Sequence, residues 1–376
     1  MIAGGPASAV KPRIVHVIDS LTRGGAETLL VTLLPELERH YDVVLVTLTP
    51  DSDFDPASVI CKERHCLGYS GPASIPSCAW KLRRIIARHQ PALVRSQLYV
   101  SSVVARIATP RRTPLIFSIH NPMSQDSYKA NRLALPLEKF TYDARHALIS
   151  VSRDALEDFD RWVGIRGSSY VLYNFINPRY FEQGRVRTAV GPQVRLVAVG
   201  MLKEQKNYRY LLEAFRALRD DSVSLDIYGE GPLRESLQQE IDREGINVVL
   251  KGKRPDIHTV LHDYDLYVMS SRYEGFGIAP VEAMATGLPL LLSDLPVLRE
   301  VSHGNALFFD PADPGSFLRR LEEVRSGAVD LAGLSARGMT LARSNYSRDG
   351  YVRRLLGIYQ DVIQARSGAA SARFPE

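Results

Sequence analysis

Short runs of Val, Ile and Leu alternate along this chain with amphipathic stretches, and this alternation limits the fold more than any other feature. RIVHVID (13–19) precedes ETLLVTLLPELER (27–39), and VRLVAVG (194–200) precedes NYRYLLEAFRALR (207–219). Strands that alternate with helices form parallel sheets covered by helices on both faces. The pattern therefore predicts an α/β protein with doubly wound, Rossmann-like sheets.

The pattern stops at a polar connector at about 182–193 and then starts again. A chain of 376 residues also fits two domains of common size. We expect an N-terminal Rossmann-like domain at 1–185, with a loose tail at 1–12, and a second such domain at 186–345 that faces it across a cleft. Residues 346–376 are expected to form a helix that packs back across the first domain and then a loose tail.

The composition is that of a globular protein, with 45% hydrophobic and 24% charged residues. The longest apolar runs, such as LLVTLL (29–34), are far shorter than the roughly 20 residues that span a bilayer. The first residues contain no apolar core of signal-peptide length. We therefore expect a cytoplasmic protein without a membrane span.

Metal binding is not favoured by the usual ligand patterns. Cys61, Cys66 and Cys78 cannot all pair, and their spacing with His65 matches no common zinc site. The acidic stretch DSDFD (51–55) lacks the glycine and the final carboxylate that a calcium loop needs. We expect free, buried or partly buried thiols, a polar loop at DSDFD, no metal and no cofactor.

The segment SSRYEGFGIAPVEAMATGLP (270–289) carries the strongest functional signal. It follows the apolar run DLYVM and contains a glycine-rich loop. Pro280 suits the first position of a helix, and Gly287 with Pro289 suits its end. A strand, a loop and a short helix are therefore expected here.

The start of that helix predicts an anion-binding position. Backbone N–H groups of about Gly277, Ile278 and Ala279 would point out of the helix, where unpaired donors and the helix dipole favour a diphosphate. Glu274 precedes the loop, and Glu282 falls near the third helical residue. Two carboxylates beside an anion site suit a ligand with hydroxyls and phosphates, such as a nucleotide sugar.

Two glutamates separated by seven residues, with FG between them and AMATG after them, resemble the motif of retaining glycosyltransferases of family 4. These proteins have the GT-B fold, and the resemblance extends over nearly the whole chain. It implies that Glu274 contacts the transferred sugar near its reacting face and that Glu282 holds the ribose hydroxyls. The alternative is that Glu274 is a solvated loop acid and that Glu282 is an ordinary residue of a first helical turn.

The segment GMLKEQKNY (200–208) resembles the family's phosphate-binding loop. The resemblance implies that Lys206 lies over the donor diphosphate, where it would offset charge on the leaving group. The family commonly has an arginine directly after the glycine, but Met201 stands there in this chain. Lys203, two residues further on, is a candidate to replace part of that charge.

The first domain offers two further candidates. Gly24 and Gly25 precede a helix expected to begin near Ala26, and glycines allow close approach of the backbone to a phosphate. This segment resembles the family's loop that closes over the donor phosphates and the acceptor. His120, at the end of PLIFSIH, matches a histidine that the family uses near the donor sugar. The alternatives are that Gly24 and Gly25 form a common turn and that His120 is an ordinary loop residue.

The second domain has two more candidate segments, GEGP and KGKRPD, which are expected to contact the base and ribose or to form tight turns. Their candidate residues are Gly229, Gly231 and Lys253. The asparagine of NFINPRYF (174–181) resembles the family's NG(I/V) turn. Phe175 stands where glycine is usual, so that turn must be built differently.

A basic region lies within the first domain, with ten Lys or Arg and a single acid in residues 61–114. Within it, residues 78–89 predict a helix with one apolar face and a basic stripe. The stripe and its aromatic neighbour are Trp80, Lys81, Arg84 and Arg88. This pattern favours docking on anionic lipid headgroups or, equally, a core-packed helix with a solvated charged face. No motif supports binding to nucleic acid.

These features predict a metal-independent, retaining glycosyltransferase. It would move a hexosyl or N-acetylhexosaminyl group from a UDP- or GDP-sugar to a glycan or a polyprenyl- or other lipid-linked acceptor, in cell-surface polysaccharide or glycoconjugate synthesis. It would act in the cytoplasm, either free or on the inner face of the membrane. A sugar-nucleotide epimerase or hydrolase of the same fold is one alternative. A non-catalytic sugar-nucleotide binder is another, because Met201 replaces an expected cation.

Overall fold

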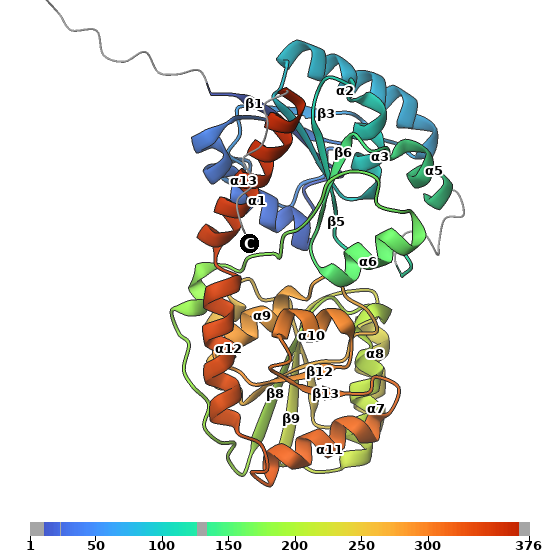
Figure 1. Cartoon of the computed structure of the whole chain (residues 1–376). Coiled ribbons are helices and arrows are strands. Elements are labelled where there is room, and N and C mark those ends of the chain that lie inside the picture. The colour runs from blue at the N-terminus through green and yellow to red at the C-terminus, as the bar shows by residue number, and fades with distance from the viewer. Residues whose placement is uncertain (1–10, 23, 126–133, 368–376) are drawn as a thin grey trace, which may run out of the picture. The chain divides into compact units, whose positions relative to one another are not determined.

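The computed structural model describes residues 11–22, 24–125 and 134–367 (Figure 1). The chain divides into two compact units. The first unit comprises residues up to Val151, Leu156–Leu172 and the chain from Val352 onward, and the second comprises Ser152–Ala155 and Tyr173–Tyr351. These units are sets of mutually packed residues, and the domain ranges expected from the sequence, with boundaries at 185 and 345, stay a prediction.

The first unit is built on a parallel sheet of seven strands in the order β3-β2-β1-β4-β5-β6-β7. Its strands are β1 (Arg13–Ile18), β2 (Asp42–Thr47), β3 (Glu63–Cys66), β4 (Leu93–Gln97), β5 (Leu115–Ile119), β6 (His146–Ser150) and β7 (Ser169–Val171). The helices between them are α1 (Gly25–His40), α2 (Ile75–His89), α3 (Tyr99–Ala108), α5 (Ala134–Thr141) and α6 (Arg153–Trp162). Valines of β1 and β2 form one core with α2 and α3.

The second unit is built on a parallel sheet of six strands in the order β10-β9-β8-β11-β12-β13. Its strands are β8 (Val194–Val199), β9 (Val223–Tyr228), β10 (Val248–Gly252), β11 (Leu266–Met269), β12 (Leu290–Ser293) and β13 (Leu307–Phe309). Its helices are α7 (Tyr208–Leu218), α8 (Arg234–Glu244), α9 (Ile278–Ala285), α10 (Pro296–Ser302), α11 (Pro314–Arg325) and α12 (Leu331–Asn345). Apolar residues of β8, β9, α7 and α11 form a core of this unit.

The prediction of doubly wound α/β sheets is confirmed. The central strands β11 and β12 are buried at every residue, as expected where helices cover both faces of a sheet, whereas the edge strand β3 (ERHC) is polar. The segment before β11, DIHTVLHDY (256–264), forms two short 3₁₀ turns, Ile257–Thr259 and Leu261–Asp263.

The strand order reverses once in each sheet, between β1 and β4 in the first and between β8 and β11 in the second. Loops that follow the two strands on either side of such a reversal diverge, and the crevice between them is where doubly wound sheets bind ligands. In the second unit these are the β8–α7 and β11–α9 loops. The sequence places Lys206 on one of these loops and Glu274 on the other.

The last helix, α13 (Arg348–Ser367), begins in the second unit and continues in the first, to which its residues from Val352 onward belong. There the ring of Tyr359 meets Tyr41 edge to face, with centroids 5.9 Å apart. Among the described residues, no helix combines the length and apolar character needed to cross a membrane.

All three cysteines are free, as expected, but they differ in exposure. Cys78 is buried and Cys61 is partly buried, whereas Cys66 is exposed. The expectation of buried or partly buried thiols is therefore wrong for Cys66, because it lies at the end of β3, an edge strand of the first sheet.

Candidate active site

The two loops at the strand-order reversal of the second sheet bring Lys206 and Glu274 into contact. Lys206 Nζ lies 2.6 Å from Glu274 Oε1. The side chains are only 15% and 7% exposed, so both charges are largely removed from water. A pair in such a position depends on both partners, since loss of one leaves a poorly solvated charge that costs about 3–5 kcal/mol.

Hydroxyl groups orient the Glu274 carboxylate. Ser271 Oγ donates to Glu274 Oε1 at 2.6 Å, so this oxygen accepts from both Ser271 and Lys206. Ser293, at the end of β12, donates to the carbonyl of Ser271 at 2.8 Å and fixes the start of the loop. The carboxylate is therefore held by Lys206 and Ser271, and β12 supports it indirectly through Ser293.

Further bonds join the β8–α7 loop to the β11–α9 loop. Ser270 Oγ donates to the carbonyls of Lys206 and Asn207, at 2.9 and 3.2 Å. Gln205 Nε2 donates to the Tyr273 carbonyl at 2.9 Å, and Arg272 Nε donates to Asn207 Oδ1 at 3.2 Å. Sequence reasoning assigned no role to these supporting residues, although they lie within the two candidate segments. Their effect is to fix the position of Lys206 relative to Glu274.

The helix after Glu274 begins earlier than expected. Gly277 is its N-cap with φ 82° and ψ 71°, a left-handed conformation that favours glycine, and no side chain caps the helix start. Helix α9 begins at Ile278, so Pro280 is its third residue and Glu282 its fifth, in place of the expected first and third. Proline is tolerated there because the first four N–H groups of a helix have no intrahelical partner. The predicted end is confirmed, since Gly287 follows the helix with φ 84°.

Glu282 has a partner that sequence reasoning did not identify. The hydroxyl of Tyr180 donates to its carboxylate. Burial raises the pKa of Glu282 to about 7, and the bond from Tyr180 opposes that rise. Tyr180 is itself buried and packs edge to face on His258, with centroids 5.7 Å apart. Glu282 therefore changes charge near neutral pH, which makes it sensitive to any ligand that donates hydrogen bonds to it.

The phenol of Tyr267 lies close enough to both carboxylates of the motif for their charges to act on it. Tyr267 lies in β11 and is fully buried. Burial raises its pKa, and the nearby Tyr208, Glu274 and Glu282 raise it further. Both glutamates thus act on one buried group, which places them on the same part of the sheet edge.

Glycines allow two loops of the second unit to pack closely. A Cβ atom on Gly229 would lie 1.9 Å from the Gly200 carbonyl oxygen, and one on Gly231 would lie 2.5 Å from the Leu202 carbonyl oxygen. Packing against the β8–α7 loop therefore explains both glycines. Their expected contacts with the donor stay a prediction.

The remaining second-unit candidates lie at the surface. Met201 is 50% exposed, Lys203 is partly exposed and Lys253 is exposed. Nothing in the structure assigns them to a ligand, so their roles stay predictions. Lys206 is the cation of the β8–α7 loop whose position is fixed by an ion pair.

The glycine pair of the first unit lies at the start of α1, which begins at Gly25, one residue before the expected Ala26. Gly24 is the N-cap, and a Cβ atom there would lie 2.3 Å from Glu27 Oε2. The Glu27 carboxylate bends back to accept from its own backbone N–H, and burial raises its pKa. An acid therefore occupies this helix start, and a phosphate could bind there only after Glu27 moves.

His120 lies above a buried polar cluster on one face of the first sheet. His16 Nε2 pairs with Gln97 Oε1 at 2.9 Å, and the guanidinium of Arg95 lies 5.7 Å from the Tyr359 ring of α13. Burial and then the charge of Arg95 lower the pKa of His120 to about 4, and burial with Arg95 lowers the pKa of His16 to about 3. His120 is therefore neutral at neutral pH and can accept or donate a hydrogen bond.

Several atoms of this cluster are buried without a hydrogen-bond partner. Within the described residues they are His16 Nδ1, Arg95 Nε and Nη1, Ser118 Oγ and His120 Nε2. A cavity of about 210 Å³ adjoins Ser118 and His120 and is also lined by Asp19, Tyr99 and Glu138. The cavity gives the first unit a polar recess at the carboxyl ends of β1, β4 and β5.

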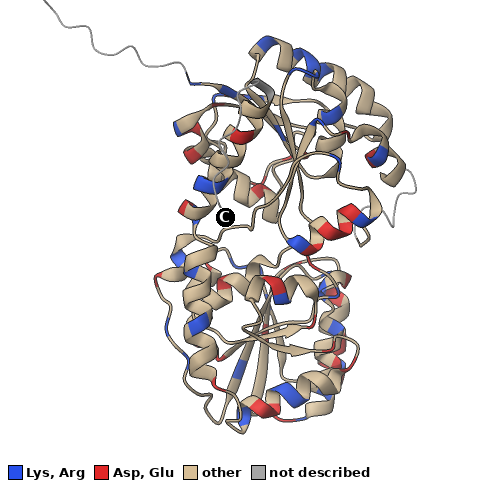
Figure 2. Cartoon of the chain, in the orientation of Figure 1, with Lys and Arg blue, Asp and Glu red and all other residues tan. Residues whose placement is uncertain are grey.

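The basic helix expected at 78–89 is α2, and its apolar face is confirmed. Cys78, Ala79, Leu82 and Ile86 are buried. Trp80 is 58% exposed, and the Arg84 guanidinium lies 4.8 Å from its ring centroid. Figure 2 shows basic residues along this helix. Lys81 is partly restrained, because its Nζ donates to the Leu67 carbonyl at 2.6 Å.

The structure thus groups Lys206, Glu274, Gly277 and Glu282 at one edge of the second sheet. Gly24, Gly25 and His120 lie in the first unit, at the carboxyl ends of its strands. Two doubly wound units with such a site define the GT-B class of fold.

Solved structures share this fold over most of the chain. The sucrose-phosphate synthase of Thermosynechococcus elongatus superimposes with a TM-score of 0.78, at 16% identity, over 94% of this chain and 100% of that one. HepE of Anabaena, solved in complex with UDP, superimposes with a TM-score of 0.77, at 18% identity, over 93% of this chain and 100% of that one.

Sequence comparison names the family. The model of Glycosyltransferase Family 4 matches residues 23–180, and that of Glycosyl transferases group 1 matches residues 193–326. The chain belongs to these glycosyltransferases, as its motifs predicted. Putative glycosyltransferase EpsF of Bacillus subtilis is 23% identical over 92% of this chain and 96% of its own length. The lipopolysaccharide core mannosyltransferase LpsB of Rhizobium meliloti is 25% identical over 52% of this chain and 62% of its own length.

Proposed function

We propose that this glycosyltransferase is a retaining, metal-independent enzyme of cell-surface polysaccharide or glycoconjugate synthesis. It transfers a hexosyl or N-acetylhexosaminyl group from a UDP- or GDP-sugar to a glycan or lipid-linked acceptor. The observation that carries the proposal is the Lys206–Glu274 pair, 2.6 Å apart, next to the uncapped start of α9. The UDP bound to HepE and the polysaccharide-related names of relatives such as LpsB support the donor and the pathway class.

Each residue of the site has a role that follows from its chemistry. The ammonium of Lys206 and the N–H groups at the start of α9 offset the charge that grows on the departing diphosphate. Glu274 orients Lys206 and contacts the sugar, and Glu282 accepts hydrogen bonds from the ribose. The sugar C1–O bond to phosphate breaks and a C1–O bond to the acceptor forms on the same face. A leaving phosphate oxygen takes the acceptor proton, so positioning matters more than a strong protein base.

The first unit supplies the acceptor site in this proposal. The 210 Å³ cavity beside His120 offers hydroxyl, carboxylate and imidazole groups that suit a sugar. Neutral His120 can bind a hydroxyl without bringing a charge. The exposed Trp80 and the cation beside it support peripheral docking of α2 on anionic lipid at the inner face of the membrane.

Transfer assays with the purified chain test the proposal. UDP- and GDP-sugars are offered with a panel of glycan and lipid-linked acceptors, and products are followed by mass spectrometry and NMR. Lys206→Ala and Glu274→Gln are expected to lower kcat by about 100-fold or more, as loss of preorganised charge does at other sites. Arg216→Ala, an exposed site on α7, is the control and should match the unchanged chain.

The same assays separate the alternatives. Near-normal turnover in either site variant would refute the assignment of these residues. Donor epimerised or hydrolysed without an acceptor would favour the epimerase or hydrolase. Donor binding without any product across the acceptor panel would favour the non-catalytic binder.

A further inference from the structure

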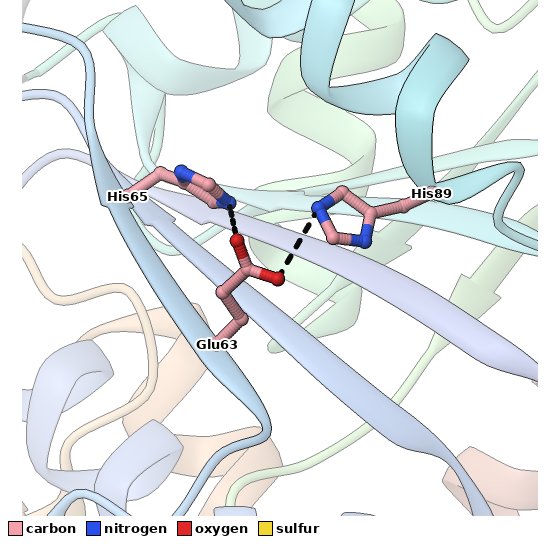
Figure 3. Close-up of side chains that lie close together, drawn as sticks. All are labelled: Glu63, His65 and His89. Atoms are coloured by element: carbon pink, nitrogen blue, oxygen red, sulfur yellow. Dashed lines mark ion pairs between the residues drawn. The ribbon is translucent and has the colours of Figure 1, made fainter.

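A second cluster of chemically active side chains lies in the first unit, on the edge strand β3 and the end of α2. Glu63 and His65 are two residues apart in β3, so they share one face of the strand. Their register partners in β2 are Val44 and Val46, which pack in the same core as α2. His89 is the last residue of α2. Strand pairing and helix packing thus direct all three side chains to the same place (Figure 3).

The distances between these groups suit a small cation. His65 Nε2 lies 3.0 Å from Glu63 Oε1, and His89 Nε2 lies 3.5 Å from Glu63 Oε2. One ligand atom from each side chain lies within 4.8 Å of the others. Ligands that bind a tetrahedral zinc ion at about 2.0–2.1 Å lie about 3.3–3.4 Å from each other. The two distances from Glu63 lie on either side of that value.

The two ring nitrogens are placed as metal ligands are. His65 Nε2 and His89 Nε2 are buried and make no hydrogen bond, although the Glu63 carboxylate is within ion-pair distance of both. Their directions thus do not suit N–H donation to that carboxylate. The His89 side chain is only 8% exposed, so its ring has little freedom to turn toward water.

We propose that Glu63, His65 and His89 bind a divalent zinc ion. Two imidazoles and one carboxylate are a ligand set that zinc uses in proteins, with a fourth position left for water. The expectation of no metal considered the cysteines with His65, and the structure directs His65 to Glu63 and His89 instead. Arg88 Nη1 lies 3.8 Å from Glu63 Oε1, but its side chain is 70% exposed and can turn toward water as the ion binds.

The ion would join the edge strand β3 to the end of α2. Bound zinc would stabilise the folded domain, because the ion binds the folded arrangement of the three side chains and not the unfolded chain. The site shares no residue with the proposed donor site. Zinc binding can therefore be tested independently of the transferase activity.

Zinc binding by the full chain tests the proposal. The protein is stripped with a chelator, and zinc is titrated by calorimetry and against a fluorescent competitor. One equivalent is expected to bind, and cobalt in its place should give the visible absorption of a four-coordinate site. Glu63→Gln, His65→Gln and His89→Gln should each weaken binding about tenfold or more, whereas His40→Gln, an exposed histidine at the end of α1, should leave it unchanged.

The results expected for a zinc site differ from those expected for an ion-pair group. Circular dichroism of the metal-free variants shows whether each one folds, and the three separate substitutions guard against one that does not. Zinc should raise the thermal midpoint of the unchanged chain and of His40→Gln by clearly more than it raises that of the folded ligand variants at the same zinc concentration. Absence of stoichiometric binding, or equal binding by the ligand variants and the control, overturns the proposal and leaves the cluster as an ion-pair group.

Discussion

Acidification should destabilise the first unit through two histidines that are neutral in the folded chain, of which His16 is buried and His120 partly buried. His16 is fully buried in β1, and the pKa of His120 at the end of β5 is lowered with it. Neither can take up a proton easily in the folded chain, because burial and the charge of Arg95 oppose it. In the unfolded chain both would titrate near the ordinary histidine value of about 6.5.

The direction and size of the change in unfolding free energy follow from this difference between the folded and unfolded pKa values. A histidine with a lowered folded pKa contributes stability that is complete above about pH 6.5 and is lost as the pH falls toward the folded value, since the unfolded state binds more protons. With folded values of about 3 for His16 and about 4 for His120, the loss between pH 8 and pH 5 is about 2 kcal/mol for each residue and about 4 kcal/mol together.

Urea unfolding at pH 8 and pH 5 measures this loss in the unchanged chain and in single variants. His16→Gln should reduce the pH-dependent loss by about 2 kcal/mol, and His120→Gln by a similar amount. His40→Gln, the exposed control, should leave it as it is. Because every other titrating group is common to the variants, their differences isolate the two sites. If His16→Gln loses as much stability on acidification as the unchanged chain, the inference that His16 is buried and neutral is refuted.

Three other predictions concern the donor site, the loop packing and the membrane. UDP affinity should fall as the pH drops through about 7, where Glu282 becomes protonated, and calorimetry on Glu282→Gln should find no such step; a step of equal size in the variant would contradict this role. Gly229→Ala should lower the free energy of unfolding by about 2 kcal/mol or more, because its Cβ would lie 1.9 Å from the Gly200 carbonyl oxygen, and an unchanged urea midpoint would argue against it. Trp80→Ala combined with Arg84→Gln should reduce co-sedimentation with anionic vesicles several-fold, and unchanged binding would remove α2 as the docking surface.

The sequence was sufficient to predict the sheets and the places of the motifs. Runs such as RIVHVID and VRLVAVG could be predicted as strands because they are short and consist mostly of β-branched and other apolar residues, and this is a local property of the sequence. A loop that follows such a strand must lie at the carboxyl edge of the sheet. Lys206 and Glu274 could therefore be assigned to one edge before their contact was known.

The partners within the site could not be predicted in the same way. The contact of Lys206 with Glu274 requires β8 to lie beside β11, and strand order is not a local property of either segment. Tyr180 reaches Glu282 from a 3₁₀ turn, Pro178–Phe181, that is far away in the chain. The cluster of Glu63, His65 and His89 likewise depends on how α2 packs on an edge strand. Periodicity indicates which face of an element is buried, but not which distant side chain meets it.

Helix α13 limits how this protein can be divided or recombined. The two family models match consecutive segments, and a cut between those segments would look natural from the sequence alone. Yet Tyr359, which packs on Tyr41 and lies over Arg95, arrives from the far end of the chain. An N-terminal fragment that lacks α13 would expose the buried guanidinium of Arg95 and the ring of Tyr41. Exchange of donor-binding domains between such enzymes would thus succeed only if the last helix stays with the N-terminal partner.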